Sequence, residues 1–530
     1  MDRSLSTVRG RRGMVTAPHH LASAAGLEVL QAGGNAAEAA VATAAALAVV
    51  YPHMNSIGGD SFWLMKRMGE PPVAIDACGR AASAAQPSLY VQAGYRTIPR
   101  RGPLAANTVA GTISGWAELL ALSGSKLPLN VILENARRMA EHGVTVTRGL
   151  EETVAGAATE LAHFSGFAAT FLPGGAPLRA GTKLHQPALA QTLSRLAEEG
   201  LESFYRGALA DDLAADLSAF GSPVSKEDLA SHRSSQVSPL STRLRDAQIF
   251  NLPPPTQGVA SLLILALFDR LACQEADGFE HVHGLVEATK LAFRVRNAHV
   301  GDPDANRWSP QGLLDDVALL DGKAREINSC RAAPWPHPPQ PGDTVWFGVV
   351  DADGCAVSAI QSTYFEFGSG LVLPRTGIVW QNRGCSFSLD EAGPNQLRPR
   401  AKPFHTLNPA LAQFDDGRTM VYGTMGGEGQ PQTQAALFTR YARFGMDLQA
   451  SVSAPRWLLG RTWGDEATNL KIEDRFPAGL IDALRAAGHD VETVPSWTSL
   501  MGHAGAIVRL PSGELEGATD PRSDGAVAAF

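Results

Sequence analysis

A short run in the second half of the chain constrains the fold most. Residues 345–350 read Val-Trp-Phe-Gly-Val-Val, and residues 351–354 read Asp-Ala-Asp-Gly. The first run predicts a buried strand, and the turn signal after it predicts a hairpin into a second strand over 356–362. The segment 333–341 just upstream is proline-rich and can form neither a helix nor a ladder. Thr344 therefore marks the point where an irregular segment enters a buried strand, a pattern that alone is more typical of a linker than of an active site.

Several glycine-rich motifs follow Thr344 in a fixed order, and others precede it. They are F-G-S-G at 367–370, G-T-M-G-G at 423–427, F-G-M-D-L-Q at 444–449 and A-P-R at 454–456, with G-M-V at 13–15, G-G-N-A at 33–36 and I-G-G at 57–59 in the first half. Together they resemble the γ-glutamyltransferase family of N-terminal-nucleophile hydrolases, from about residue 13 to 525. The resemblance implies an α+β fold, a four-layer αββα sandwich. It also implies two fragments, 1–343 and 344–530, that form one composite domain.

Composition limits the partners and the compartment. With 530 residues and 44% apolar content the chain can bury a large core, and length alone would favour three or four domains where the resemblance favours one. A net charge of -8 without a sustained basic run argues against a nucleic acid or an anionic membrane as partner. The first residues lack the apolar run of a secretory signal, and the five cysteines are scattered. We therefore expect a cytoplasmic protein with reduced thiols.

Elsewhere the chain alternates helical and strand patterns. Apolar spacing predicts helices over 21–32, 36–50, 109–123, 129–142, 186–199, 203–220, 259–274, 279–299, 433–444 and 477–487. Strands are predicted over 62–65, 72–76, 377–381, 420–423 and 506–510, and a loop over 251–258. Asn35 is placed to cap the helix over 36–50. Glu287, Lys290 and Arg294 share one face of the helix over 279–299, and we expect that face to be solvated.

The resemblance assigns the chemistry to Thr344. A threonine hydroxyl is a poor nucleophile unless a base lies beside it, and the α-amino group of the same residue can serve once the preceding bond is cut. That group titrates near ~7.7 to 8, which suits a base at neutral pH. We therefore expect the precursor to cleave itself between Asp343 and Thr344. The alternative is an ordinary strand threonine in a single-chain, non-catalytic binding protein.

Two glycines and a serine complete the expected catalytic set. By resemblance, Gly426 and Gly427 form the oxyanion hole, because adjacent glycines let backbone N–H groups approach a developing oxyanion. A nucleotide-binding loop is the alternative, but the run matches no phosphate-binding fingerprint. Ser362 aligns with a family hydroxyl that bonds the nucleophile, its alternative being a plain sheet serine. No metal or cofactor is expected, since the histidine pairs 19/20 and 281/283 lack a third ligand at suitable spacing.

The binding half departs from the γ-glutamyl pattern. The family's carboxylate-binding arginine falls at Cys78, and the acidic residue that holds the substrate amino group falls at Ser386. At the positions of the paired serines, an asparagine and a glutamine, this chain has His405, Thr406, Tyr364 and Arg383.

A cation without an anionic partner suits a substrate that has a carboxylate and no ammonium group. Arg383, with His405 and Thr406, is expected to clamp that carboxylate, and Tyr364 to shorten the pocket. Arg80 is the reserve candidate for the missing arginine. These motifs, with Ile57-Gly58-Gly59-Asp60 among them, resemble the oxamate amidohydrolase branch.

The expected activity is hydrolysis of a small carboxylate-bearing amide, most simply oxamate to oxalate and ammonia. The alternative within enzymes is γ-glutamyl hydrolysis or transfer. The two fragments are expected to stay associated and to pair as a dimer of heterodimers.

Overall fold

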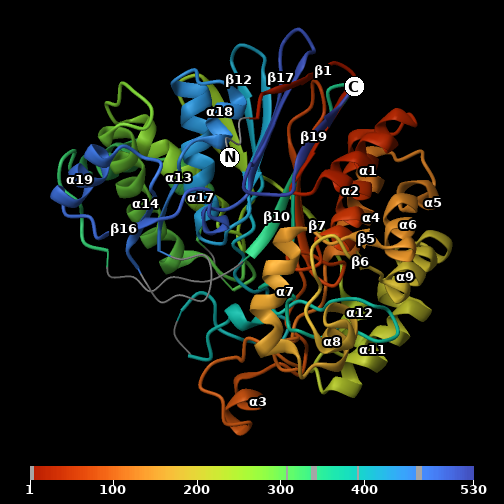
Figure 1. The fold of residues 1–530 in the computed structure, drawn as a ribbon. Coiled ribbons are helices and arrows are strands. Elements are labelled where there is room, and N and C mark those ends of the chain that lie inside the picture. Colours follow the sequence, from red (N-terminus) through yellow and green to blue (C-terminus); the bar gives the residue numbers. More distant parts are fainter. Residues whose placement is uncertain (1–4, 306–307, 336–342, 391–392, 461–467) are drawn as a thin grey trace.

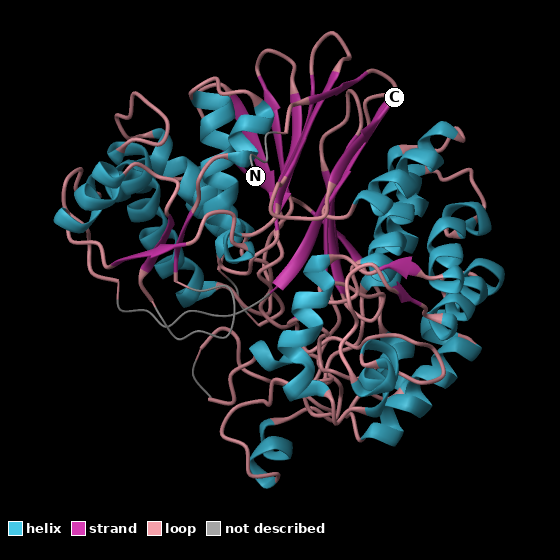
Figure 2. Ribbon diagram, viewed as in Figure 1, coloured by secondary structure: helices cyan, strands magenta, loops and turns pink. Residues whose placement is uncertain are grey.

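Two seven-stranded sheets stand face to face at the centre of the computed structural model, which describes residues 5–305, 308–335, 343–390, 393–460 and 468–530 (Figures 1 and 2). The first sheet has the order β1 (Val8–Gly10), β18 (Leu515–Thr519), β17 (Ala504–Arg509), β13 (Thr419–Thr424), β12 (Ala410–Phe414), β9 (Ala247–Asn251) and β8 (Leu240–Arg243). The second has the order β19 (Ala526–Ala529), β2 (Gly13–Ala17), β10 (Asp343–Asp351), β11 (Ala356–Tyr364), β3 (Asp60–Lys66), β4 (Val73–Ala77) and β7 (Ser235–Val237). The ladders within both sheets are antiparallel.

Helices cover the outer face of each sheet. Of the helices on the side of the second sheet, α1 (His20–Gln31), α2 (Ala36–Val50) and α4 (Thr112–Ser123) contact its strands. The other helices on that side are α3 (Pro87–Gln92), α5 (Leu129–Ile132), α6 (Glu134–His142), α7 (Arg148–Leu161), α8 (Ser165–Phe171), α9 (Pro187–Glu199), α10 (Ser203–Arg206), α11 (Ala208–Phe220) and α12 (Lys226–Ser231). On the side of the first sheet, α13 (Gly258–Asp269), α15 (Pro310–Asp315), α17 (Gly429–Phe438) and α18 (Leu448–Ser453) contact its strands, and α14 (Phe279–His299), α16 (Val317–Glu326) and α19 (Ala478–Ala486) complete the layer. Small sheets pair β5 (Val144–Thr145) with β6 (Lys183–Leu184) and join β14 (Trp457–Leu459), β15 (Leu470–Glu473) and β16 (Val491–Val494). The expected four-layer αββα sandwich is confirmed.

Alternate side chains of strand β10 belong to two different hydrophobic cores. Val345, Phe347 and Val349 point into the core beneath the helices, whereas Trp346 and Val350 point into the space between the sheets. The indole of Trp346 lies on Gly423 of β13, where an added Cβ would come within 2.2 Å of it. Glycine is therefore required there for the two sheets to pack this closely.

The strands of the two expected fragments are interleaved. In the second sheet, β10 lies between β2 and β11, and β3 follows β11, so segments from both sides of Thr344 are hydrogen-bonded neighbours. The first sheet mixes them as well, because β12 pairs with β9. A cut before Thr344 would leave the fragments joined by ladder hydrogen bonds and by shared cores.

Most of the predicted elements are present, with shifted ends. Asn35 forms a capping box with Glu38 at the start of α2. The expected helices over 129–142 and 203–220 are each interrupted, at Leu133 and Gly207. The strand expected over 377–381 is wrong, since Val379 and Trp380 form only isolated bridges.

One face of α14, which was expected to be exposed to solvent, is partly buried. Glu287 and Lys290 were expected in solvent but are only 3% exposed, and they form an ion pair of 2.7 Å. Part of the proline-rich segment, 336–342, lies outside the described residues. Among the described helices none is both long and apolar enough to cross a bilayer.

A network of buried ion pairs lies beside β17 and β18. Asp520 contacts Arg456 at 2.5 Å and Arg522 at 3.1 Å, and Glu473 contacts Arg522 at 2.6 Å. Burial would raise the pKa of Asp520, but the charges of the two arginines overcome it and hold the pKa at about 2. Asp520 also accepts a hydrogen bond from the N–H of Ala504, at the start of β17.

Asp520→Asn should lower the midpoint of urea unfolding, because two buried arginines lose their shared anion. Breaking one side of a buried pair costs ~3–5 kcal/mol. Since the folded pKa is depressed, the contribution is present above the unfolded value of ~3.9 and is lost as the pH falls towards 2. The gap between parent and variant should therefore close over that window. Asp415→Asn, at an exposed pair with Arg243, is the control and should leave the midpoint unchanged. A full-sized gap at pH 2 would contradict the charge origin.

Candidate active site

Thr344 lies at the start of β10 with its side chain buried between the sheets. Its hydroxyl lies 3.5 Å from the hydroxyl of Ser362 on β11 and accepts a hydrogen bond of 3.4 Å from Gln430 Nε2 in the first turn of α17. Ser362 in turn accepts from the N–H of Tyr364 at 2.8 Å. The structure thus brings together the threonine and the serine that the sequence singled out. Gln430 was not assigned a role from sequence.

Gly426 and Gly427 lie between β13 and α17, just before Gln430 in the chain. Their φ angles are 115° and 51°, a region that glycine adopts without strain. Neither of their N–H groups donates a hydrogen bond to a residue that the structure describes. The side chain of Gln257 fixes this loop by donating to the carbonyl of Gly427 at 2.9 Å and to that of Thr406 at 2.7 Å. Backbone donors that the described residues leave unpaired are what an oxyanion hole requires.

Arg383 is the buried cation of the site. It lies in a 3-10 turn, Arg383–Ser386, and is 1% exposed. Its guanidinium carbon lies 3.7 Å from the ring centroid of Tyr364, and Nη1 donates to the carbonyl of Phe404 at 3.3 Å. Nη2 has no hydrogen-bond partner within the described parts of the chain. A buried donor in that state costs free energy unless a ligand satisfies it.

His405 and Thr406 lie on the loop that also supplies the acceptor for Arg383. Both side chains are fully buried, and neither imidazole nitrogen nor the threonine hydroxyl has a hydrogen bond to a described residue. The backbone of His405 is tied to Pro255 and Gln257, and its ring packs against Phe62 at 4.9 Å. Burial and the positive charges of Arg383 and Lys402 lower the pKa of His405 well below its usual value, so the ring is neutral.

Asp60 is the residue that sequence reasoning missed. It begins β3 directly opposite Ser362 on β11, and it is 1% exposed. Its Oδ1 accepts from Gly79 N (2.8 Å), Gly111 N (3.0 Å) and Gln381 Nε2 (3.1 Å). Its Oδ2 has no hydrogen bond to a described residue and lies 3.5 Å from His405 Nε2. The available signal was the aspartate that ends the Ile57-Gly58-Gly59-Asp60 motif.

Asp60 adds an acid close enough to influence Arg383, which was expected to be a cation without an anionic partner. Burial raises the pKa of Asp60 to about 7, while the three hydrogen bonds to Oδ1 and the charge of Arg383 oppose the rise. Arg383 and Asp60 form no direct ion pair, yet each affects the pKa of the other. The site therefore holds one cation and one weak acid.

The buried polar cluster of Asp60, Arg383, His405 and Thr406 is called the chamber below. The remaining sequence candidates lie outside it or contact residues next to it. The backbone N–H of Cys78 bonds Asp76, which pairs with Lys402 at 2.6 Å, and Ser386 donates to the carbonyl of Phe404. Arg80 is 40% exposed in its side chain and pairs with Asp304 at 2.8 Å. It lines a different cavity beside Asp228 and Arg400, so it is not placed to replace Arg383.

The histidine pairs serve the fold. His19 caps α1, and His281 bonds Thr439 and the backbone of Asp277. His283 lies in a group of three residues with metal-ligand side chains, which the sequence spacing did not predict. The ligand-type atoms of His283, Glu287 and His489 lie within 4.8 Å of one another. Their polar atoms already have partners within the protein. His283 Nδ1 lies 2.9 Å from His489 Nε2, and the ammonium group of Lys290 forms an ion pair with the carboxylate of Glu287.

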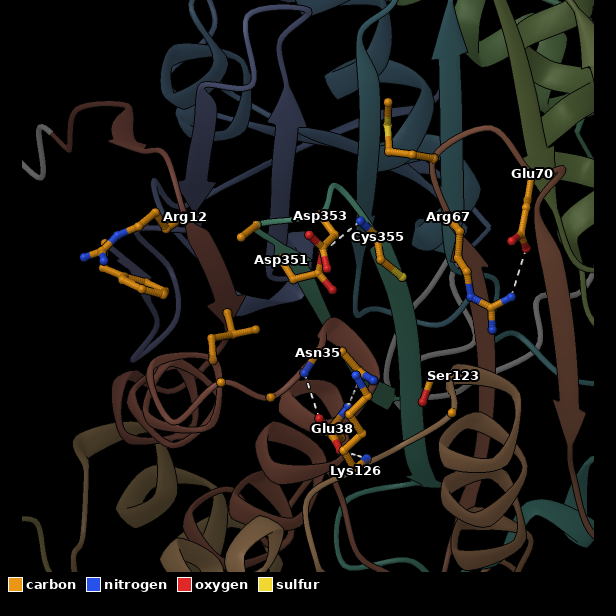
Figure 3. Close-up of a pocket in the computed structure, with 17 residues that line it drawn as sticks. Arg12, Asn35, Glu38, Arg67, Glu70, Ser123, Lys126, Asp351, Asp353 and Cys355 are labelled. Carbon is orange, nitrogen blue, oxygen red and sulfur yellow. Dashed lines mark hydrogen bonds and ion pairs between the residues drawn. The ribbon is translucent and has the colours of Figure 1, made fainter.

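The cavity drawn in Figure 3 lies at the opposite end of β10 from Thr344 and is about 590 Å³ in volume. Asp351, Asp353 and Cys355 line it from the hairpin, and Glu38 lies at its floor, bonded to Asn35 and Lys126. A strand rises ~3.4 Å per residue, so Asp351 is roughly 24 Å from Thr344. This cavity is not part of the site around Thr344.

Comparisons with known proteins agree with this arrangement. Residues 22–530 match the Gamma-glutamyltranspeptidase family. The oxamate amidohydrolase proenzyme of Klebsiella pneumoniae subsp. pneumoniae is 54% identical, over 98% of each chain, and the glutathione hydrolase-like YwrD proenzyme of Bacillus subtilis is 41% identical, over 98% of this chain and 99% of its own. Among solved structures, cephalosporin acylase from Bacillus halodurans superposes with a TM-score of 0.92 at 35% identity, covering 99% of this chain and 97% of its own. The chain belongs to the γ-glutamyltranspeptidase family.

Proposed function

We propose that this protein is a self-processing amidohydrolase in which the bond between Asp343 and Thr344 is cut and the freed Thr344 acts as the nucleophile. The relatives named as proenzymes support processing. The position of Thr344 at the start of a buried strand, 3.5 Å from Ser362, supports the choice of residue. The proposed fragments are residues 1–343 and 344–530, held together by the interleaved sheets.

In the first half of the reaction Thr344 Oγ1 attacks the amide carbonyl carbon, and its proton passes to the α-amino group of Thr344. The negative charge on the carbonyl oxygen is stabilised by the N–H groups of Gly426 and Gly427. When the intermediate collapses, the C–N bond breaks and the α-amino group returns the proton to the leaving nitrogen, which departs as ammonia. An ester on Thr344 remains.

Water completes the cycle. The α-amino group takes a proton from a water molecule, whose oxygen attacks the ester carbonyl. The same N–H groups stabilise the second oxyanion, and its collapse breaks the ester bond and returns the proton to Thr344 Oγ1. The product is the free acid, and the enzyme returns to its starting state.

We infer that the substrate is a small amide with its own carboxylate, most simply oxamate, which becomes oxalate and ammonia. The observation that carries this inference is Nη2 of Arg383, which has no hydrogen-bond partner among the described residues and belongs to a buried guanidinium stacked on Tyr364. Arginine binds carboxylates through paired charge-assisted bonds, and His405 and Thr406 add unpaired polar atoms. The similarity to an oxamate amidohydrolase proenzyme agrees with this choice.

Hydrolysis of γ-glutamyl compounds is the second candidate. The similarity to the glutathione hydrolase-like protein favours it, and Asp60 supplies an acid that a substrate ammonium group would need. Against it, Ser386 donates its hydroxyl to Phe404 and offers no carboxylate. A cytoplasmic location, pairing of two heterodimers, and the lack of a nucleic-acid or membrane partner remain predictions.

Purified protein should run as two unequal bands, with the smaller fragment beginning at Thr344. Thr344→Ala should remain one chain, because it lacks the hydroxyl that attacks the preceding bond. Thr344→Ser should process slowly and keep some activity, since it retains the hydroxyl without the γ-methyl group that restricts its rotamer. N-terminal sequencing of the smaller band measures the result, and a new end at any other residue would remove Thr344 from the mechanism.

Arg383→Ala should lower kcat/KM for oxamate more than roughly a hundredfold, because a buried charge pair broken on one side loses ~3–5 kcal/mol. Arg383→Lys should recover part of this loss, as an ammonium keeps the charge without the two-pronged geometry. Ammonia release measures both variants, and both should still process into two bands.

Arg80→Ala is the matched control, since this arginine pairs with Asp304 outside the chamber, and its activity should equal that of the parent. Full oxamate turnover by Arg383→Ala would contradict the clamp. A parent enzyme that prefers a chromogenic γ-glutamyl anilide to oxamate would favour the second candidate.

A further inference from the structure

The two oxygens of Asp60 have different surroundings. Oδ1 accepts three hydrogen bonds from N–H donors, at 2.8 to 3.1 Å, and a proton on it would displace at least one of them. Oδ2 has no hydrogen bond to a described residue, and His405 Nε2 lies 3.5 Å from it. A proton on Asp60 therefore belongs on Oδ2, where it can be donated to the ring of His405.

The charge count of the chamber changes when a substrate carboxylate binds. Because the ring of His405 is neutral and Lys402 is already paired with Asp76, the cation of the chamber is Arg383 and its acid is Asp60. One added anion would leave the buried site with a net negative charge. An uncompensated buried charge is strongly destabilising, so the complex favours a neutral Asp60.

We propose that Asp60 is a specificity-determining residue, which takes up one proton from solvent on Oδ2 as the substrate carboxylate binds at Arg383 and releases it when the product leaves. This inference rests on the proposed function. The neutral acid then donates to His405 Nε2, which leaves Nδ1–H of the same ring as a donor. The anionic acid would hold the ring in the opposite tautomer and add repulsion towards the substrate.

Other groups around Asp60 do not titrate in the same range. Cys78 after β4 and Tyr205 on α10 both feel the charge of Asp60, and burial raises the pKa of each above its usual value. Burial lowers the pKa of His405, and Arg383 stays charged because the pKa of a guanidinium is high. The α-amino group of a processed Thr344 is the remaining group that titrates near neutrality.

The test is the pH dependence of KM for oxamate between pH 6 and 9, in the parent and in Asp60→Asn. Asparagine imitates the protonated acid, because its oxygen can keep the three donors and its amide can donate to His405. With a pKa of about 7 for the free acid, KM of the parent should rise towards tenfold for each pH unit above 7. KM of Asp60→Asn should stay flat over the same range and fall below the parent value at pH 9.

Asp228→Asn is the matched control, since Asp228 is equally a buried aspartate but serves the cap of α12. It should keep the slope of the parent. If Asp60→Asn shows the parental slope, the dependence belongs to the α-amino group and the proposal is wrong. If its KM is higher than the parental KM at every pH, a negative Asp60 is needed and the proposal is equally overturned.

If Asp60→Asn fails to process, calorimetry with oxalate tests the same proposal on the unmodified protein. Binding heats in buffers of different ionisation enthalpy count the protons exchanged, and close to one proton should be taken up per oxalate at pH 8. No uptake would overturn the role of Asp60. Absence of oxamate turnover by the parent would instead contradict the proposed function, so the two failures are distinguishable.

Discussion

The contact of Trp346 with the facing sheet is the constraint on which the site depends. Its indole lies over Gly423 and Gly505, where a Cβ would come within 2.2 and 2.5 Å of the ring. Because these two glycines admit the ring, β10 packs closely against β13 and β17. Thr344 is two residues before Trp346, and Gly426 is three residues after Gly423. This packing contact therefore holds the strand that begins with Thr344 against the strand that leads into the Gly426–Gly427 loop.

The chamber beyond this contact is built around buried polar atoms that the described protein leaves unsatisfied. They belong to Asp60, Arg383, His405, Thr406 and Gln430, all of them nearly inaccessible to solvent. Such atoms cost free energy in the empty site, and a polar ligand of matching shape recovers it. The interleaved sheets and the buried Asp520 network supply the stability that holds this arrangement.

Sequence reasoning succeeded where structure follows from local order. The strand after Thr344 and the cap at Asn35 each depend on neighbouring residues, so short patterns predict them. It failed where partners come from distant segments. Asp60 meets His405 across more than three hundred positions, and Glu287 and Lys290 look like a solvated face until Ala333 and His489 cover them. Apolar periodicity also did not predict the breaks in the helices at Leu133 and Gly207.

The most direct test of the account is the mass of the small fragment during turnover. Processed enzyme is mixed with excess oxamate and quenched in acid, and both fragments are weighed and mapped by peptide. The account predicts that the fragment beginning at Thr344 gains the mass of one oxalyl group, carried by Thr344. An unmodified fragment under turnover, or an oxalyl group on any other residue, would contradict Thr344 as the nucleophile.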